Sequence, residues 1–471
     1  MRRTKIVCTM GPACDSVEIL KNMMNEGMNV ARLNMAHGEL EDHSDRIAKI
    51  RAAVAETGAN VSILMDIKGP EIRIGKLKEA SYELKAGNKL ALVTEEQLGD
   101  GEKLWVNYAD LPKVMEPGGV ILLDDGLIEL RVDSVDAANV YCTIINGGVI
   151  KPRKGVNLPG VRTTLPGVTD RDVKHIEFGI GEGVDIVAAS FVRRAEDVLE
   201  IRRLLEEGGA GHIQIVSKIE NQEGVENLDA IIEASDGIMV ARGDLGVEIP
   251  VEDVPLIQKE MIDKCNAAGK PVIVATHMLE SMQVNPRPTR AEVTDVANAV
   301  LQGTDAVMLS GETAAGKYPV ESIRTMSTIA IKAESLIEYG SNLHKKGFGQ
   351  SSSITEVISQ AVVSSSLELE ASAILSPTES GFTARMVSKY RPKAPIVAIT
   401  SDERIQRRLA LVWGVTAIKG TKSESTDALF SSSIEAGRAA GLINSGETVV
   451  ITAGVPSGKS GATNLIKIEQ V

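Results

Sequence analysis

The sequence predicts an α/β protein: a (β/α)8 TIM barrel with an inserted small β-barrel domain and a C-terminal open α/β sheet domain. Three observations predict this architecture. Eight short aliphatic runs alternate with amphipathic segments, a stretch of different texture interrupts them once, and the alternation resumes after a polar join. The 471 residues suffice for about three domains of ordinary size.

The eight aliphatic runs have the character of strands that are buried on both faces of a parallel sheet. They span residues 4–9, 28–34, 60–66, 184–190, 213–218, 236–241, 270–276 and 305–310. Amphipathic segments such as 16–27 and 194–208 separate most of them, and a last helix is expected near 320–337. Eight alternating strands and helices fit one closed barrel.

The third and fourth runs are too far apart for one connecting helix. The segment between them holds short alternating runs broken by Gly, Asp and Asn, at 89–95, 118–126, 127–132 and 140–145. This pattern is typical of a small antiparallel β-domain. Because such a loop opens at the catalytic face of a barrel, the insert is placed to act as a lid.

A Gly/Ser-rich join at 339–353 separates the barrel from a second run of strands and helices. Its predicted strands are 371–376, 394–400, 414–420, 447–454 and 464–471. We therefore expect a barrel of residues 1–69 and 168–340, an insert of 70–167 and a C-terminal regulatory domain of 352–471. These lengths are ordinary for domains.

Composition excludes several classes of protein. Lys plus Arg number 51 and Asp plus Glu number 64, a net charge of −13, which argues against a dedicated binder of nucleic acid or anionic membrane. No run of about 18 apolar residues predicts a membrane helix, and the N-terminus lacks the features of a signal peptide. Four scattered cysteines without a CxxC pair fit a reduced cytoplasm and no zinc site.

Polar residues follow the predicted strands, at the rim where barrel enzymes place their working groups. They are Arg32, Asn34, His37, Asp66, Lys68, Glu71, Arg73, Lys218, Glu220, Arg242, Gly243, Asp244, Thr276, His277, Ser310 and Glu312. Carboxylates on neighbouring strands without a His/Cys cluster suit magnesium. Any one of these residues could instead cap a helix or form a salt bridge, but gathering all of them without a ligand is costly.

Lys218 and Glu220 stand two positions apart, so they point to the same face of a strand. A cation beside metal ligands can stabilise charge on a transferring phosphoryl group. The GDLG segment at 243–246 is either a turn before a helix or a set of free backbone amides that bind a carboxylate.

Seven motifs together resemble pyruvate kinase, in the right order and over essentially the whole chain. They are ARLNMAHG, DIKGPEIR, KGVNLPG, SKIENQEG, DGIMVARGDLGVEIP, NPRPTRAE and TDAVMLSGETAAGKYP. The resemblance implies a glycolytic, cytoplasmic enzyme that moves phosphate from phosphoenolpyruvate to ADP, giving pyruvate and ATP. It also implies Mg²⁺ (or Mn²⁺) as cofactor, a homotetramer and allosteric regulation by a phosphorylated effector.

The resemblance further implies roles for many of these rim residues and for Lys154 of the insert. Lys218 would stabilise the transferring phosphoryl group, and Thr276 or Ser310 would relay the proton to the enol. Magnesium would be held by Glu220 and Asp244. The substrate would be bound by Arg32, Gly243, Asp244 and Thr276. The nucleotide would be bound by Asn34, His37, Arg73 and Lys154.

The sequence departs from the family at a monovalent-cation site. Family members usually carry hydroxyls at the positions of Ala36 and Ile67, which here lack a side-chain oxygen. Asn34 and Asp66 remain as ligands, and Glu71 matches the members that require potassium. The resemblance therefore implies a weakened K⁺ site.

Two segments near the C-terminus have candidate phosphate-binding character. Residues 376–392 resemble the family's effector loop, in which five residues would cradle a phosphate: Ser376, Thr378, Ser380, Gly381 and Thr383. Such a Ser/Thr-rich turn is also a routine helix cap. The effector's identity among fructose 1,6-bisphosphate, AMP and ribose 5-phosphate stays open, and the extra C-terminal domain of some relatives is not expected.

The second segment, 453–460, loosely matches a nucleotide-binding loop. The residues after it have the pattern of a loop and a strand, whereas a nucleotide-binding loop needs a helix behind it. A surface loop is therefore the favoured interpretation.

Two other functions compete with the phosphotransferase. A magnesium-dependent barrel lyase acting on pyruvate-like acids would also use an arginine, a Glu/Asp pair and a carboxylate-binding turn. It needs neither the lid with Lys154 nor a regulatory sheet. A non-enzymatic metabolite sensor would lack the catalytic lysine, and Lys218 is present.

Overall fold

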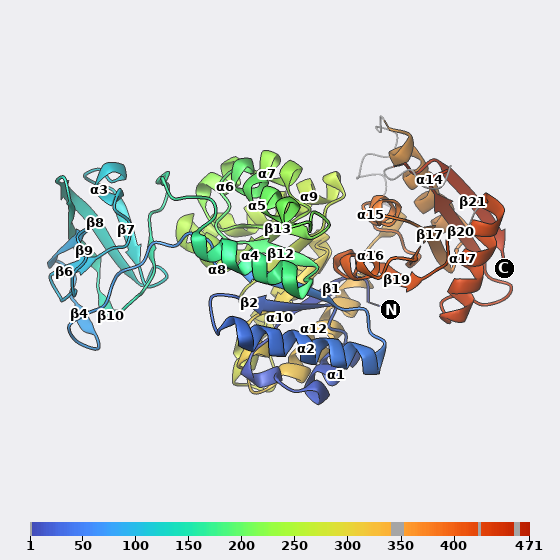
Figure 1. Ribbon diagram of the computed structural model, residues 1–471, viewed down its shortest axis with the longest axis horizontal. Helices are drawn as coiled ribbons and strands as arrows, with labels where there is room; N and C mark the ends of the chain where they lie inside the picture. The colour runs from blue at the N-terminus through green and yellow to red at the C-terminus, as the bar shows by residue number, and fades with distance from the viewer. Residues whose placement is uncertain (1, 341–352, 423–424, 456–461) are drawn as a thin grey trace.

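The computed structural model describes residues 2–340, 353–422, 425–455 and 462–471. Three parts lie in a row, with the barrel in the middle, the inserted strands at one end and the C-terminal sheet at the other (Figure 1). The sequence stretches 341–352 and 456–461, which contain most of the predicted join and of the nucleotide-loop match, fall outside the described residues.

Eight parallel strands close the barrel, as predicted. They are β1 (Lys5–Thr9), β2 (Val30–Asn34), β3 (Ser62–Ile67), β12 (Ile186–Ala189), β13 (Gln214–Ile219), β14 (Gly237–Ala241), β15 (Val272–Ala275) and β16 (Ala306–Leu309). Their order around the barrel is β1-β16-β15-β14-β13-β12-β3-β2. All strand residues except Asn34 and Lys218 are buried, because helices cover the outside and side chains fill the inside.

Helices surround the barrel and begin at polar caps. The α-helices are α1 (Val17–Asn25), α2 (Leu40–Thr57), α4 (Asp170–Glu182), α5 (Ala195–Glu207), α6 (Gln222–Glu226), α7 (Leu228–Ala234), α8 (Arg242–Glu248), α9 (Val254–Ala268), α10 (Arg290–Gln302), α11 (Gly311–Ala314) and α12 (Pro319–Glu334). Thr169 caps α4 and Thr289 caps α10, each in a reciprocal capping box. The expected last helix is α12 and ends three residues before 337, close to the usual scatter of helix ends.

The inserted strands lie between β3 and α4. They are β4 (Tyr82–Leu84), β5 (Lys89–Val93), β6 (Lys103–Trp105), β7 (Val120–Leu123), β8 (Ile128–Val135), β9 (Asn139–Asn146), β10 (Gly148–Ile150) and β11 (Val156–Asn157), with the short helix α3 (Leu111–Val114). They form a six-stranded sheet, β11-β7-β8-β9-β5-β6, and the pair β10-β4. Every pair is antiparallel except β5 with β6. Both sheets share one apolar core.

The C-terminal part is an open sheet of order β19-β18-β17-β20-β21. Its strands are β17 (Ala373–Pro377), β18 (Ile396–Thr400), β19 (Val415–Lys419), β20 (Thr448–Ala453) and β21 (Leu465–Gln470), and only β21 runs antiparallel. Its helices are α14 (Ile354–Glu368), α15 (Phe382–Ser388), α16 (Glu403–Arg408) and α17 (Thr426–Ala439). Over the described residues, no helix combines the length and apolarity that crossing a bilayer requires.

The C-terminal domain closes the barrel interior at the amino ends of the strands. Leu411, in the 3₁₀ turn Leu409–Leu411, packs with inward-facing strand residues such as Val7, Val30 and Met308. At the same end, Lys5 is buried and its Nζ donates to the Val415 carbonyl at 2.6 Å. The amino ends of the barrel strands are therefore in contact with the C-terminal domain.

Replacing Lys5 with methionine is expected to stabilise the protein more at pH 6 than at pH 9. Burial, helped by the charge of Arg2, lowers the pKa of Lys5 to about 7. Below pH 7 the folded state therefore carries a buried charge, which lowers the free energy of unfolding. Above pH 7 the buried amine is neutral, and this loss of stability decreases as the pH approaches the pKa of Lys5 in the unfolded chain. Thermal melts at both pH values, with the surface variant Lys264→Met as control, measure this; an equal shift at both would contradict it.

Candidate active site

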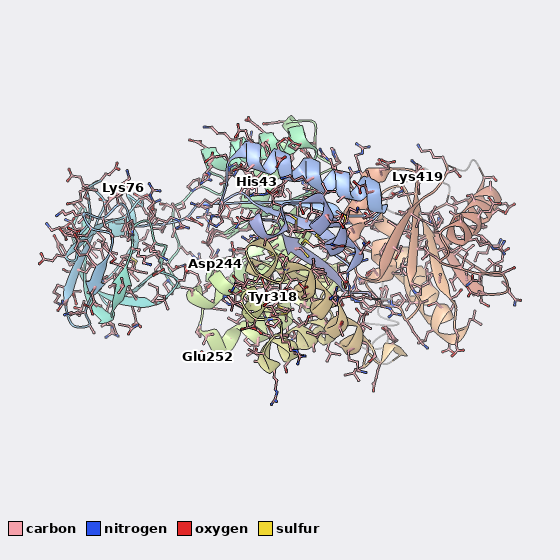
Figure 2. All side chains as sticks on the ribbon, turned by 90° about the horizontal axis from the view of Figure 1, so that it is seen from below. His43, Lys76, Asp244, Glu252, Tyr318 and Lys419 are labelled. Carbon is pink, nitrogen blue, oxygen red and sulfur yellow. The ribbon has the colours of Figure 1, made fainter. Side chains whose placement is uncertain are left out.

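The predicted rim residues lie at the barrel end that faces the inserted strands. Figure 2 shows Asp244 on that side of the barrel. The parallel register explains the gathering, because the carboxyl ends of all eight strands meet at one edge. Asn34, for example, lies directly opposite Asp66 on the neighbouring strand.

Arg32, Asp66 and Lys218 form a buried charged cluster inside the rim. Arg32 Nε donates to Asp66 Oδ2 at 2.7 Å, and Lys218 Nζ donates to Asp66 Oδ1 at 3.2 Å. Burial alone would raise the pKa of Asp66, but the charges of Lys218 and Arg32 outweigh it and hold this pKa below its usual value. Asp66 therefore stays ionised and fixes the position of both cations.

Lys218 and Glu220 point the same way, as strand alternation requires. Lys218 Nζ lies 3.0 Å from Glu220 Oε1. Burial would lower the pKa of Lys218, but the neighbouring carboxylates of Asp66 and Glu220 raise it overall. Lys218 is therefore a permanent cation, suited to stabilising negative charge and not to acting as a base.

Glu220 and Asp244 form an acidic pair beside Lys218. Burial raises the pKa of Glu220 to about 7, against the opposing effect of Lys218 and with the added repulsion of Asp244. Burial also raises the pKa of Asp244, again against Lys218. Glu220 Oε2 accepts from the Phe191 amide at 2.6 Å, and its Oε1 forms the ion pair with Lys218.

This donor set fits a hard divalent cation. Glu220 is buried and Asp244 is partly buried, and burial raises the pKa of both carboxyls; a bound cation would offset this cost of burial. Among the described residues, no group of three or more His, Cys, Asp or Glu side chains is arranged to hold a metal ion by itself. Remaining positions around Mg²⁺ would be filled by water and substrate oxygens, as is usual for this ion.

A strained turn after β15 adjoins Asp244. Thr276 and His277 have φ values of 68° and 54°, a conformation that costs a non-glycine residue energy. Arg242 stabilises the turn, because its Nη2 donates to the Thr276 carbonyl at 2.5 Å and its Nη1 to Asp295 at 2.8 Å. The Gly243 amide donates to Thr276 Oγ1 at 2.8 Å.

The predicted nucleotide residues lie on the insert side of the rim. Arg73 Nε pairs with Glu71 at 2.5 Å, and Lys154 pairs with Asp124 at 2.7 Å. Asn34 is half-buried and His37 is exposed. The segments that carry Arg73 and Lys154 are paired, because Arg73 forms a bridge with Gly155 and the Ile74 amide donates to the Lys154 carbonyl at 2.9 Å.

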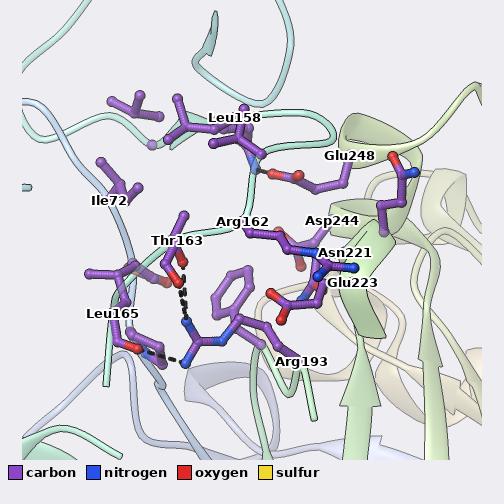
Figure 3. Close-up of a pocket in the computed structure, with 18 of the residues that line it drawn as sticks. Ile72, Leu158, Arg162, Thr163, Leu165, Arg193, Asn221, Glu223, Asp244 and Glu248 are labelled. Atoms are coloured by element: carbon purple, nitrogen blue, oxygen red, sulfur yellow. Dashed lines mark hydrogen bonds between the residues drawn. The ribbon is translucent and has the colours of Figure 1, made fainter. Parts of the chain in front are cut away.

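A cavity of about 210 Å³ lies between the insert and the barrel, and Figure 3 shows residues that line it. Asp244, Glu71 and Arg73 belong to its lining, whereas Lys218 and Arg32 do not. Substrate-sized space therefore opens at Asp244, on the side of the inserted strands.

Ser310 bonds a residue of its own loop, Glu312. Its amide donates to Glu312 Oε2 at 2.7 Å. Buried Glu312 also accepts from the Leu279 amide at 3.0 Å. Glu312 therefore ties the loops after β15 and β16 together, which is a structural role.

Several of the predicted potassium and effector residues bond other parts of the protein. Asn34 Oδ1 accepts from the Ala36 amide at 3.1 Å. In the effector-like loop, Thr378 Oγ1 accepts from the Gly381 amide at 3.0 Å, and Thr383 bonds Thr463. Ser376 Oγ is buried without a hydrogen bond, and Ser380 lies between these residues on the same turn.

Sequence reasoning missed three residues of the site. Ser190 Oγ accepts from Lys218 Nζ at 2.7 Å, and Thr9 Oγ1 accepts from Arg32 Nη1 at 2.9 Å. Both end predicted strands, so the rule that selected the other rim residues could have found them. Arg193, which bonds the Leu165 carbonyl at 2.8 Å and Thr163 Oγ1 at 3.1 Å, carried no such signal; it clamps the segment through which the insert rejoins the barrel (Figure 3).

Comparison with known proteins gives consistent matches. Residues 1–323 match the family model for the pyruvate kinase barrel domain, and residues 356–469 match that for the pyruvate kinase alpha/beta domain. The chain is 56% identical over its full length to pyruvate kinase of Geobacillus stearothermophilus, covering 80% of that protein. It is 50% identical to that of Clostridium acetobutylicum, with both chains fully covered.

A solved structure is similar as well. The crystal structure of a pyruvate kinase from Cryptosporidium parvum superposes with a TM-score of 0.95 at 41% identity, covering 100% of this chain and 96% of that one.

Proposed function

The chain belongs to the pyruvate kinase family of phosphotransferases, and from this premise we propose that it transfers the phosphoryl group of phosphoenolpyruvate to ADP with Mg²⁺ (or Mn²⁺) as cofactor. The observation that carries the proposal is the buried array in which Lys218 meets Asp66 on one side and Glu220 on the other. A permanent cation beside Glu220, one of the two carboxylates that would hold a divalent ion, is what phosphoryl transfer needs, because that reaction depends on positioning and charge neutralisation.

Phosphoenolpyruvate would be held between Arg32 and the turn at Gly243. Arg32 is fixed by Asp66 and Thr9, so its remaining N–H groups are held in place for the substrate phosphate. The carboxylate would lie by Gly243, Asp244 and Thr276. The metal, held by Glu220 and Asp244, would supply charge neutralisation to the phosphate oxygens when bound.

Lys218 would stabilise the phosphoryl group as it leaves the enol oxygen for ADP. It needs no proton transfer for this role, because its charge is permanent. Arg73 and Lys154 would bind the nucleotide phosphates from the lid side, with Asn34 and His37 beside them. Closure of the lid would exclude water, which otherwise competes with ADP as acceptor.

The enol left behind must gain a proton. Thr276 or Ser310 would relay it. Thr276 accepts a hydrogen bond from the amide of Gly243, the residue before Asp244. Ser310 donates its amide to Glu312 instead.

A coupled assay separates this function from the barrel lyase. ADP-dependent loss of phosphoenolpyruvate with formation of ATP is expected. Cleavage of a carbon–carbon bond without nucleotide would contradict the proposal and support the lyase.

We also propose a weakened potassium site. Asp66 already accepts from Arg32 and Lys218, and Asn34 Oδ1 from the Ala36 amide, so few oxygens are left for the ion. Restoring a hydroxyl with Ala36→Ser is expected to lower the half-activating potassium concentration about tenfold. Titration of potassium against sodium in both proteins measures this. Full activity of the natural chain in sodium alone would remove potassium as a cofactor, and a sharp requirement at low potassium would show that the hydroxyls are dispensable.

Family membership supports four further proposals. We propose regulation by a phosphorylated effector at residues 376–383, a homotetramer, a cytoplasmic location, and domain bounds of 1–69 with 168–340, 70–167 and 352–471. Steady-state kinetics with candidate effectors, together with sedimentation of the purified protein, test the first two.

A further inference from the structure

The loop that follows β12 (residues 190–193, the β12 loop) borders the candidate active site. Lys218 Nζ donates to Ser190 Oγ at 2.7 Å, and the Phe191 amide donates to Glu220 Oε2 at 2.6 Å. One short loop therefore contacts both the lysine and the carboxylate on which the proposed function depends.

Both connections between the insert and the barrel meet the same loop. On the outgoing connection, Gly69 packs so closely that a Cβ added to it would lie 2.7 Å from the Ser190 carbonyl oxygen. On the returning connection, Arg193 Nη2 donates to the Leu165 carbonyl at 2.8 Å, and its Nη1 donates to Thr163 Oγ1 at 3.1 Å (Figure 3). A movement of the insert about these connections must therefore change contacts of the β12 loop.

The β12 loop is itself held in a strained conformation. Phe191, which lines the cavity between the insert and the barrel, has a φ of 56°. The Arg193 amide donates to Asp197 Oδ2 at 3.0 Å, and the Arg193 carbonyl accepts from Asn227 Nδ2 at 2.9 Å. Such strain persists only where the surrounding contacts fix it, so the position of the Phe191 amide depends on the contacts that hold Arg193.

The Arg193 side chain is suited to fixing one geometry. It is 5% exposed, and its Nε lies 3.5 Å from Asp197 Oδ2. The donors of a guanidinium form a rigid fork, so two acceptors on the returning connection are held at fixed positions relative to the barrel. The ion pair of Arg162 with Glu226 joins the same connection to the barrel, but both side chains are exposed and such pairs contribute little.

We propose that Arg193 is a positioning residue for the phosphoryl transfer. It fixes the returning connection against the β12 loop, so that the insert keeps one orientation over Lys218 and Glu220. Its effect on catalysis rests on the proposed function, whereas its hold on the insert does not. Arg193 acts through the placement of the nucleotide-binding side of the insert and through the Phe191 amide.

Steady-state kinetics of Arg193→Met test the effect on catalysis. The KM for ADP is expected to rise about tenfold and kcat to fall about tenfold, because the insert loses its fixed orientation. Affinity for phosphoenolpyruvate without ADP, measured by calorimetry with Mg²⁺ present, is expected to change less than about twofold, because Asp66 and Thr9 still hold Arg32.

The matched control is Arg202→Met. Arg202 is a half-buried arginine of α5 that pairs with Asp236 and donates to the Ile213 carbonyl at 3.0 Å. Its loss is expected to lower the Tm and to leave kcat and the KM for ADP unchanged. Equal kinetic changes in the two variants, or none in Arg193→Met, would reduce Arg193 to a structural residue and overturn the proposal.

Limited trypsin cleavage of the full chain without substrates measures the hold on the insert directly. The exposed Arg162 precedes Thr163 on the returning connection, and a loosened connection is cleaved faster. Cleavage after Arg162, relative to other sites, is expected to be about tenfold faster in Arg193→Met and unchanged in Arg202→Met. An unchanged rate in Arg193→Met would overturn the proposal even if the natural chain showed no phosphoryl transfer, so the two failures are distinguishable.

Thr163→Val tests the same contact from the side of the insert. It removes one acceptor of Arg193 and is expected to change the KM for ADP and the cleavage rate in the same direction, but less. The double variant should be no worse than Arg193→Met alone, because both changes break one interaction. Thr164→Val is the control, since Thr164 Oγ1 bonds the Tyr108 hydroxyl within the insert. Should Arg193→Met fail to fold, natural values for Thr163→Val in both measurements would overturn the proposal.

Discussion

Replacing Lys218 with methionine is expected to reduce turnover about 10³-fold. The variant keeps the length of the side chain and removes the one permanent cation that touches both Asp66 and Glu220. Charge that develops on the transferring phosphoryl group would then lack its stabilising partner. Initial rates at saturating phosphoenolpyruvate and ADP measure the effect.

Loss of Lys218 also leaves two buried carboxylates without their cation, so stability must be measured beside activity. Removing one member of a buried ion pair costs roughly 3–5 kcal/mol, and the melting temperature should fall. Lys264→Met removes a surface lysine that pairs with Asp229 and Glu260, and should change neither quantity. Full turnover in a folded Lys218→Met protein would remove the assigned role.

Replacing Glu220 with glutamine is expected to raise the magnesium concentration needed for half-maximal activity by at least about tenfold and to lower turnover about 10²-fold. Glutamine has almost the same shape but brings a neutral amide to the buried site. One of two protein oxygens that would hold the cation then loses its charge. Magnesium titrations of activity, and of protein fluorescence without substrates, measure the two effects separately.

The same variant should be no less stable than the natural chain when metal is removed with a chelator. Burial and the nearby Asp244 raise the pKa of Glu220 to about 7, so in the metal-free protein the carboxylate is held against repulsion. Glu248→Gln is the matched control, because Glu248 is another partly buried carboxyl on the cavity wall and accepts from Asn157 at 2.8 Å. An unchanged magnesium requirement in Glu220→Gln would contradict the metal site.

Patterns within single elements predicted most of the fold. The aliphatic runs become the eight strands of the barrel and the five strands of the C-terminal sheet, because burial on both faces selects continuous apolar sequence. The same patterns placed Lys218 and Glu220 on one strand face, since side chains alternate with period two. Residues at strand ends could be assigned to one rim because parallel strands share a direction.

Such patterns could not predict the contacts between elements that are distant in the sequence. That Leu411 plugs the barrel, that Arg193 clamps the returning segment at Thr163 and Leu165, and that Ser190 meets Lys218 depend on how the chain closes and docks.

The sequence by itself determined the strand–helix alternation, the insertion point and the set of polar groups at the rim, because each follows from periodicity and chain direction along one element. Only the tertiary structure decided which of those groups touch and which carboxylates stay charged. Those properties arise from burial and from distances across strands, and neither is encoded in the spacing of residues along the chain.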